Sequence, residues 1–341
     1  MLYIRVDGNE RIATGHIMRC LSIAKALRSL GEESVFILAE PYGKPIIEKE
    51  GFQTICLNGS YDKITEETEQ MEELIARQRI EKMLVDSYFV DETYLEHLRR
   101  NTSLIYIDDI GGKLYPCDLL INYCNYHDRY RYEERYGGTG TRLLLGCSYA
   151  PLREEFSGRG ERQFDEFREI LITTGGTDTY NMAYKIGMAM AECPVLQNIK
   201  IHIVAGRFNT HIARLRELES RSENIVIHHN AGNMAELMMN CDTAVSAGGT
   251  TLYEICYCGL PTVCFAFADN QLDGTGTFGE QGIMINTGDI RREPDRAVKE
   301  IVENVCRLAE DSGLRREFSD KMRKLVDGNG AFRIAKEIQA L

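Results

Sequence analysis

A histidine stands where a polar loop runs into a helix, in the stretch "RVDGNERIATGHIMR" (5–19). His16 follows the apolar run 2–6 and precedes an amphipathic pattern, so we expect it in the first turn of a helix behind a strand. The helix dipole disfavours a charged imidazole there, and a neutral imidazole can act as a base. The spacing therefore predicts either a general base or a capping or packed histidine, and His16 alone does not decide between them.

Two glycine pairs predict a phosphate site. The stretches "TTGGTDTYN" (173–181) and "SAGGTTLYE" (246–254) each leave an apolar strand and enter a helix. Glycine lets backbone N–H groups approach a phosphate closely, and a helix N-terminus adds partial positive charge. A tight turn explains each pair about as well, but both pairs lie in the same half of the chain at strand-to-helix joints, which favours one shared diphosphate site. Neither pair matches the dinucleotide-binding fingerprint or the P-loop motif. The candidate residues are Gly175, Gly176, Thr177, Gly248, Gly249, Thr250 and Thr251.

Three polar side chains could complete a nucleotide-sugar site. Glu254 falls in the first turns of the helix behind the second glycine pair, where its carboxylate can accept hydrogen bonds from a ribose. Favourable pairing with the helix dipole is an equal alternative. Asn270 and Gln271, in "FADNQ" (267–271), carry amides that can hold a water or a sugar amide, although Asp269 and Asn270 are also ordinary helix caps.

The elements that must position these residues alternate between short apolar runs and longer amphipathic ones. This alternation is typical of βα units and parallel sheets. Helices are clearest over 17–29 and 65–79. Strands are expected at 2–6, 34–38, 54–57, 83–86, 104–107, 119–121, 169–174, 200–204, 224–228, 242–246 and 261–265.

The pattern breaks at 151–168, where a proline, glycines and charges predict a linker. The expected organisation is an α/β fold of two doubly wound, Rossmann-like domains facing a cleft. These are an N-terminal domain over 1–152 that carries His16, and a second domain over 153–327 that carries both glycine pairs.

Composition excludes several partners. The 341 residues include 52 acidic and 40 basic side chains, so no broad positive field gathers nucleic acid or anionic lipid. The 11 cysteines form no C-x-x-C pair and predict small core residues in a reducing cytoplasm, not disulfides or a zinc site. The chain starts on a strand and no apolar run approaches the roughly 18 residues of a membrane span. We expect a cytoplasmic protein that uses no metal or cofactor. A monomer is slightly favoured over an oligomer.

A set of motifs along the chain carries a family resemblance. They are "RVDGNERIATGHIMRCLSIAKAL" (5–27), "VDSY" (85–88), "YIDD" (106–109), "LLGCSYAPLREEF" (144–156), "TTGGTD" (173–178), "SAGGTTLYE" (246–254), "ADNQ" (268–271) and "VDGNGAFRI" (326–334). Together they resemble the UDP-2,4-diacetamido-2,4,6-trideoxy-β-L-altropyranose hydrolases of pseudaminic acid biosynthesis and related spore-coat polysaccharide proteins. The resemblance implies a GT-B fold of the MurG kind, with UDP bound in the domain over 153–327. It also implies that residues 328–341 form a terminal helix that packs back on the first domain.

The implied reaction is metal-independent hydrolysis of the anomeric C–O bond with inversion, which gives UDP and a free diacetamido-trideoxy sugar. It is a step in pseudaminic acid or related nonulosonic acid biosynthesis, as in flagellin glycosylation. By position, His16 matches the family's essential histidine, Asn270 the amide that helps hold the attacking water, and Glu254 the ribose-binding carboxylate. The glycine loops match the diphosphate contacts. The matched motifs add further candidates for substrate contact, namely Gly15, Arg5, Asp7, Asp86 and Tyr88.

Other functions stay open at this stage. A GT-B glycosyltransferase would use the same fold with an acceptor alcohol in place of water. A lipid acceptor is disfavoured because residues 1–150 hold 18 basic and 24 acidic side chains. A hydrolysing 2-epimerase is disfavoured by the motifs. A non-catalytic UDP-sugar-binding protein would not need both His16 and Asn270.

Overall fold

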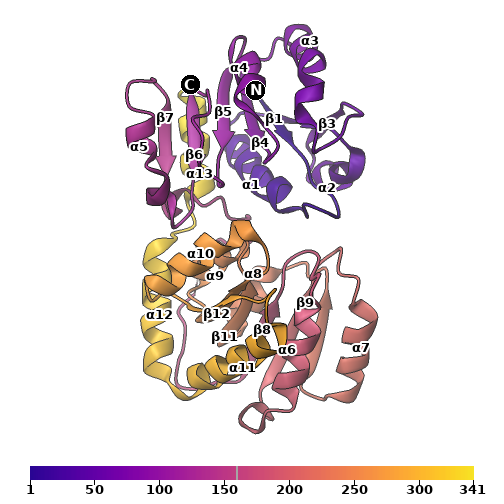
Figure 1. Ribbon diagram of the computed structural model, residues 1–341, viewed down its shortest axis with the longest axis vertical. Coiled ribbons are helices and arrows are strands. Elements are labelled where there is room, and N and C mark those ends of the chain that lie inside the picture. The colour runs from indigo at the N-terminus through magenta and orange to yellow at the C-terminus, as the bar shows by residue number, and fades with distance from the viewer. Residues whose placement is uncertain (159) are drawn as a thin grey trace. The chain divides into compact units, whose positions relative to one another are not determined.

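The computed structural model describes residues 1–158 and 160–341, and its contacts divide the chain into two compact units (Figure 1). Unit 1 comprises Met1–Glu154 and Gly328–Leu341, and unit 2 comprises Glu155–Asp327. Among the described residues, no helix is both long and apolar enough to cross a membrane.

Unit 1 is built on a parallel sheet of seven strands in the order β3-β2-β1-β4-β5-β6-β7. The strands are β1 (Leu2–Val6), β2 (Ser34–Leu38), β3 (Gln53–Cys56), β4 (Lys82–Asp86), β5 (Ser103–Ile107), β6 (Leu119–Asn122) and β7 (Arg142–Leu145). The helices are α1 (Gly15–Ser29), α2 (Lys44–Lys49), α3 (Thr68–Gln78), α4 (Glu92–Arg99), α5 (Tyr132–Arg135) and α13 (Gly330–Gln339).

Both faces of this sheet are covered, which explains why its central strands are apolar throughout. Tyr3, Val85 and their neighbours pack on one face against α3 and α4. On the other face, α1 packs on β1 and β2, and α13 packs along α1. Gly330 begins α13 so close to residue 150 that an added Cβ would lie 2.2 Å from the Ala150 carbonyl oxygen. The last helix is thus an integral part of unit 1.

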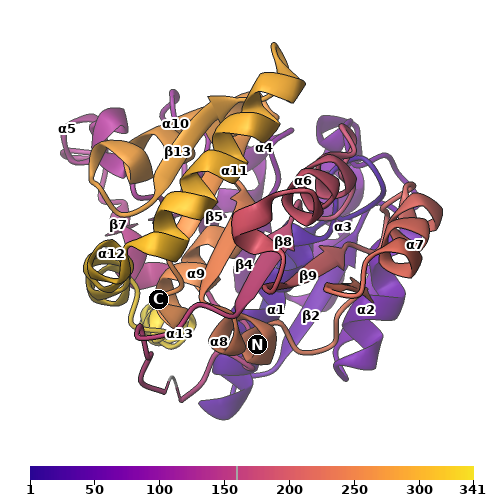
Figure 2. The same cartoon turned by 90° about the horizontal axis from the view of Figure 1, so that it is seen from below.

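Unit 2 repeats the design with six parallel strands in the order β10-β9-β8-β11-β12-β13. The strands are β8 (Glu169–Thr173), β9 (Lys200–Ala205), β10 (Ile225–His229), β11 (Thr243–Ala247), β12 (Thr262–Ala266) and β13 (Ile285–Asp289). The helices are α6 (Met182–Ala191), α7 (Ile212–Arg221), α8 (Met234–Asn240), α9 (Thr251–Cys258), α10 (Asp269–Glu280), α11 (Pro294–Glu310) and α12 (Ser312–Leu325). Figure 2 shows α6 and α11 side by side, and both pack on the apolar core of this sheet.

The predicted strands are confirmed to within two residues, but two edge strands were not predicted. β7 is short and half-exposed, and β13 reads "INTGD", in which asparagine, glycine and aspartate are poor strand formers. The predicted helix over 65–79 is shorter than expected, because a 3-10 turn occupies Ile64–Glu67 and Arg79 ends α3 with φ +53°.

In both sheets the strand order reverses beside the first strand of the unit, between β1 and β4 and between β8 and β11. In doubly wound folds, ligands bind beyond the carboxyl ends of the strands at such switch points. His16 follows β1, and the two glycine pairs follow β8 and β11. The topology therefore brings His16 and the glycine pairs to the switch point of their own unit.

Candidate active site

His16 is the second residue of α1 and is 7% exposed. The loop from β1 is compact: a Cβ added at Gly8 would lie 2.6 Å from Ile17 Cδ1, so a larger residue there would push the start of α1 away. Asn9 Oδ1 accepts from the backbone N–H groups of Arg11 and Ile12 and closes the turn. Thr14, at the N-cap, makes no side-chain capping bond, so His16 is positioned by its own contacts.

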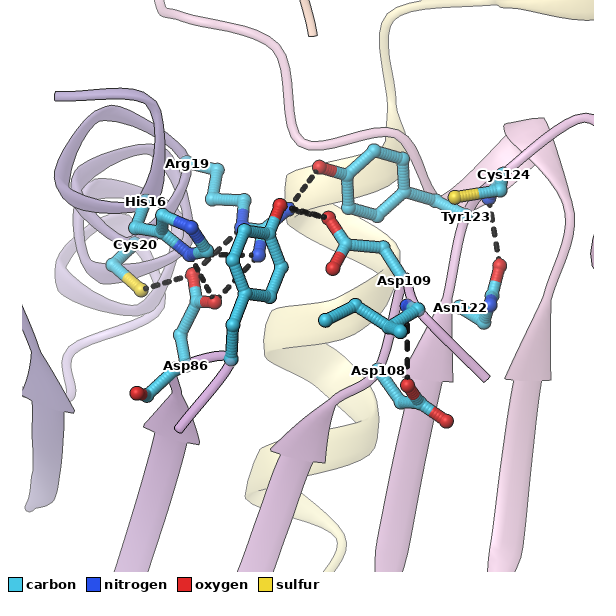
Figure 3. Close-up of polar contacts among 12 residues, drawn as sticks. His16, Arg19, Cys20, Asp86, Asp108, Asp109, Asn122, Tyr123 and Cys124 are labelled. Atoms are coloured by element: carbon cyan, nitrogen blue, oxygen red, sulfur yellow. Dashed lines mark hydrogen bonds and ion pairs between the residues drawn. The ribbon is translucent and has the colours of Figure 1, made fainter. Parts of the chain in front are cut away.

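The principal contact is with Asp86, the last residue of β4, which pairs with Val6 at the end of β1. His16 Nδ1 lies 2.6 Å from Asp86 Oδ1 (Figure 3). Arg19, one helical turn after His16, donates to the same carboxylate from Nε at 2.6 Å and from Nη2 at 2.5 Å. Burial by itself raises the pKa of Asp86, but attraction to Arg19 and His16 outweighs it and holds the pKa well below its ordinary value.

An ionised Asp86 fixes the tautomer of the neutral imidazole. A carboxylate only accepts hydrogen bonds, so Nδ1 of His16 must carry the proton that faces it. The 2.9 Å contact of Arg19 Nη2 with Nδ1 then joins two donors and is not a hydrogen bond. Nε2 is left with the lone pair, and a neutral His16 can take a proton only at this atom.

Arg19 links the histidine to the loops behind β5 and β6. Its Nη1 lies 2.6 Å from Asp109 Oδ2 and 2.6 Å from the hydroxyl of Tyr123. The ring of Tyr88 meets the imidazole edge-on, with centroids 4.5 Å apart, and its hydroxyl donates to Asp109 at 3.3 Å. The other oxygen of Asp109, Oδ1, is buried and has no partner among the described residues. It is a free acceptor next to Arg19 and Tyr88, which both contact His16.

Arg19, Asp109 and Tyr123 were not predicted as site residues. Arg19 lies three residues after His16 and so shares its helix face, and Asp109 ends a motif directly behind a strand. Both signals are present in the sequence. Tyr123 lies in a tyrosine-rich segment, and nothing in the pattern separates it from the tyrosines that only pack.

Three of the predicted substrate contacts, Arg5, Asp7 and Asp86, are buried and paired within unit 1. Arg5 is 0% exposed and donates to Glu67 at 2.6 and 2.9 Å as well as to Asp7. Asp7 Oδ1 accepts from the backbone N–H of Ala39. Asp86, 1% exposed, is saturated by His16 and Arg19. These three side chains hold the loops together, whereas Gly15 and Tyr88 are partly exposed at the site.

In unit 2, the first glycine pair is pressed against the loop behind β9. A Cβ added at Gly206 would lie 2.5 Å from the Gly175 carbonyl oxygen, and Phe208 N–H donates to Gly176 at 3.1 Å. Thr177 is partly exposed at this turn. Arg207, which the sequence did not single out, is exposed beside Gly206 and makes no ion pair with any described residue. It supplies a cation at the predicted diphosphate loop.

Asp178 closes this loop onto α6. Its carboxylate accepts from the backbone N–H groups of Met182 at 2.8 Å and Ala183 at 3.1 Å. Burial raises its pKa to about 6, and the backbone hydrogen bonds oppose that shift. Asn181 Oδ1, at the N-cap of α6, and Asn209 Nδ2, in the loop behind β9, are buried and have no partner among the described residues. Polar groups of this kind are usually satisfied by water or a ligand.

The second glycine pair lies against the start of α10. A Cβ at Gly248 would meet Thr275 Cγ2 at 2.5 Å and Gln271 Cβ at 3.0 Å, so only glycine fits. Gly249 and Thr250 are exposed at the turn into α9, Thr251 is its first residue and Glu254, 8% exposed, its fourth.

The two predicted amides differ in their surroundings. Asn270 is the second residue of α10 and is exposed. Gln271 Oε1 accepts from the backbone N–H of Phe267 at 3.0 Å, so its oxygen is engaged in holding the loop behind β12. Asn270 therefore remains open to a ligand, whereas Gln271 is a loop anchor with only its amide nitrogen left to offer.

The resemblance predicted from the sequence is confirmed by comparison with known proteins. A family model described as "Protein of unknown function (DUF354)" matches residues 194–329. The spore coat polysaccharide biosynthesis protein SpsG of Bacillus subtilis is 24% identical, over 99% of this chain and 97% of its own. The UDP-2,4-diacetamido-2,4,6-trideoxy-β-L-altropyranose hydrolase of Campylobacter jejuni is 23% identical, over 80% and 94% respectively.

Solved structures establish the architecture. MurG of Acinetobacter baumannii covers 100% of this chain with a TM-score of 0.71 at 12% identity. The spinosyn rhamnosyltransferase SpnG, solved with thymidine diphosphate, covers 99% with a TM-score of 0.64, also at 12% identity. The chain has a GT-B fold. This confirms the predicted fold class of two Rossmann-like domains, and identities this low carry the fold alone.

Proposed function

We propose that this chain hydrolyses the anomeric C–O bond of a UDP-2,4-diacetamido-2,4,6-trideoxyhexose and releases UDP and the free sugar. The observation that carries the proposal is the buried His16–Asp86 contact of 2.6 Å, which leaves Nε2 as the basic atom. The activity for which the Campylobacter jejuni relative is named supplies the substrate class. The pathway we assign is pseudaminic acid or related nonulosonic acid biosynthesis.

The proposed step begins with a water whose proton passes to His16 Nε2. Its oxygen forms a bond to the anomeric carbon, and the bond from that carbon to the diphosphate oxygen breaks with its electron pair leaving on UDP. Attack from the face opposite UDP inverts the anomeric centre. Asp86 stabilises the imidazolium that forms, in the way a buried carboxylate assists a histidine base.

We assign binding of the nucleotide part of the substrate to unit 2. Backbone N–H groups at the loops of Gly175–Thr177 and Gly248–Thr251, with the N-terminus of α9, stabilise the charge that develops on the leaving diphosphate. Arg207 adds a full positive charge. Glu254 is assigned to the ribose hydroxyls, and Asn270 to holding the water.

Two groups of unit 1 suit the sugar. Asp109 Oδ1 is a buried acceptor without a partner, as an acetamido N–H or a sugar hydroxyl requires. Tyr88 presents a partly exposed ring against His16, a surface suited to an apolar methyl group. A diacetamido-deoxy sugar offers both kinds of group.

A glycosyltransferase is the second candidate, because the solved structures of this fold named above are a MurG and a rhamnosyltransferase. Incubation with UDP-2,4-diacetamido-trideoxyhexoses and with UDP-N-acetylglucosamine in ¹⁸O-labelled water separates the two. Label at the anomeric oxygen of a released sugar supports hydrolysis at carbon. Label in UDP shows attack at phosphorus and refutes the mechanism, and UDP release only when an acceptor alcohol is added supports the transferase.

A further inference from the structure

A second cluster of reactive side chains lies at the amino end of the unit 2 sheet. Glu169 is the first residue of β8, His202 the third of β9, and Cys241 lies two residues before β11. One donor atom from each residue lies within 4.8 Å of the other two. The glycine loops follow the opposite, carboxyl ends of β8 and β11, so this cluster is separate from the proposed diphosphate site.

We propose that Glu169, His202 and Cys241 bind a divalent transition-metal ion, with Zn²⁺ as the ion that fits best. A mixed carboxylate, imidazole and thiolate set suits zinc, whereas calcium and magnesium take oxygen ligands. One carboxylate and one thiolate neutralise the charge of a divalent ion. The three protein ligands leave a fourth tetrahedral position for a water molecule.

His228 supports the orientation that this site needs. Its Nε2 lies 2.9 Å from His202 Nδ1, and the two rings stack with centroids 5.1 Å apart. A histidine that binds a metal with one nitrogen commonly donates the other N–H to a neighbouring acceptor, which fixes the ring. With His228 accepting from Nδ1, the remaining nitrogen of His202 faces Glu169, whose Oε2 lies 3.0 Å away.

The spacing needs only a small adjustment. Bond lengths to tetrahedral zinc place neighbouring donor atoms about 3.3–3.6 Å apart. The contact of Glu169 with His202 is already 3.0 Å, and the widest separation in the cluster is no more than 4.8 Å. The Glu169 side chain is 31% exposed and has room to move, whereas His202 and Cys241 are buried and provide the fixed part of the site.

Arg162 anchors the cysteine side of the cluster. Its guanidinium donates to the backbone carbonyl of Cys241 at 2.5 Å and to that of Cys258 at 2.9 Å. These bonds fix the backbone of Cys241, while burial raises the pKa of its thiol, so the thiolate forms as the incoming ion displaces the proton. Metal binding displaces the thiol proton, and it ties together the segments that begin β8, β9 and β11.

Cobalt binding to the full chain, stripped of metal with a chelator, tests the site. Co²⁺ bound to a thiolate gives a charge-transfer absorption band, and we expect one saturable equivalent per chain that Zn²⁺ displaces. Cys241→Ala should remove the band, and Glu169→Gln should weaken Co²⁺ binding at least tenfold. Cys264→Ala, which removes another buried thiol of unit 2 outside the cluster, is the matched control and should keep the band.

Thermal unfolding gives a second measurement. A metal that binds only the folded chain raises its unfolding midpoint, so added Zn²⁺ should raise the midpoint of the native protein and of Cys264→Ala but not of Cys241→Ala. Glu169→Gln keeps the size of the side chain and serves if Cys241→Ala fails to fold. Native protein without saturable binding, or binding that Glu169→Gln and Cys241→Ala leave unchanged, overturns the proposal.

Discussion

Replacing Asp86 with asparagine tests whether the carboxylate drives the proposed base. The amide keeps the size of the side chain but removes the charge that stabilises an imidazolium 2.6 Å away. A hydrogen bond to a charged group contributes about 1.5–3 kcal/mol, and two charges roughly 4 Å apart attract by about 4 kcal/mol at an effective dielectric constant of about 20. Because Arg19 shares the carboxylate, we expect a net loss of about 2–4 kcal/mol in the transition state, which lowers kcat about 30- to 1000-fold.

The assay is UDP release from the diacetamido-trideoxyhexose nucleotide, measured for Asp86→Asn, for His16→Ala and for the double variant. If Asp86 acts through His16, the double variant should be no slower than His16→Ala, because residues that act as a unit are not additive. UDP affinity should stay within a factor of three, since the proposal assigns UDP to unit 2. The reasoning would be refuted if the kcat of Asp86→Asn stayed within threefold of the native value while His16→Ala was inactive.

A structural effect must be separated from this catalytic one. Asp86→Asn leaves the buried Arg19 with Asp109 as its remaining carboxylate, and breaking a buried ion pair costs about 3–5 kcal/mol of stability. Asp108→Asn is the matched control. It changes another buried carboxylate, which accepts from Tyr132 at 2.8 Å and from the Gly111 N–H, with no contact to His16. It should lower the unfolding midpoint while leaving the pH profile of kcat unchanged.

Three further predictions concern single side chains. His16→Asn should abolish turnover while UDP affinity, measured by calorimetry, stays native; turnover in a folded variant contradicts the base assignment. Arg207→Ala should weaken UDP binding about tenfold at low salt and less at high salt, because it removes one exposed charge. Arg214→Ala removes another exposed arginine and is the control. Equal UDP affinities of the two variants would contradict the role of Arg207 at the diphosphate. Burial raises the pKa of Asp178 to about 6, so its stabilising contribution is complete below its ordinary value of 3.8 and is lost as the pH rises through 6. Asp178→Asn keeps a hydrogen-bonding side chain at this position but does not titrate. Between pH 4 and 7, the free energy of unfolding of the native chain should therefore fall by about 1–3 kcal/mol relative to that of the variant. If urea unfolding gives the same pH dependence of this free energy for both proteins, the assignment is wrong.

The sequence predicted the elements that its pattern encodes locally. Apolar runs such as Leu2–Val6 are buried on both faces and were recognised, and the glycine pairs were recognised because a strand and a helix flank them. β13 was missed, since an edge strand whose residues are all half-exposed needs no apolar pattern. Placement at the carboxyl ends of the strands follows from parallel topology and was therefore predictable for His16.

Partners that come from distant segments were not predictable in the same way. Arg5 lies within β1 and Asp86 ends the neighbouring β4, and both are charged residues in otherwise apolar runs. Yet Arg5 pairs with Glu67, 62 residues away, and Asp86 with His16, 70 residues away. Which carboxylate meets which base depends on side-chain packing between elements. The cluster of Glu169, His202 and Cys241 has the same origin, because no short spacing links the three residues.

Under the proposed function, the two switch points use one topology for two kinds of chemistry. A base needs a charged partner shielded from water, and unit 1 places buried side chains, His16, Arg19 and Asp86, at the ends of β1 and β4. A diphosphate needs several donors at close range, and unit 2 places glycines at the ends of β8 and β11, where side chains would keep the backbone away. Neither arrangement could replace the other. Any side chain at position 248 would collide with Thr275, and a glycine at position 86 would remove the carboxylate that compensates the charge of Arg19 beside His16.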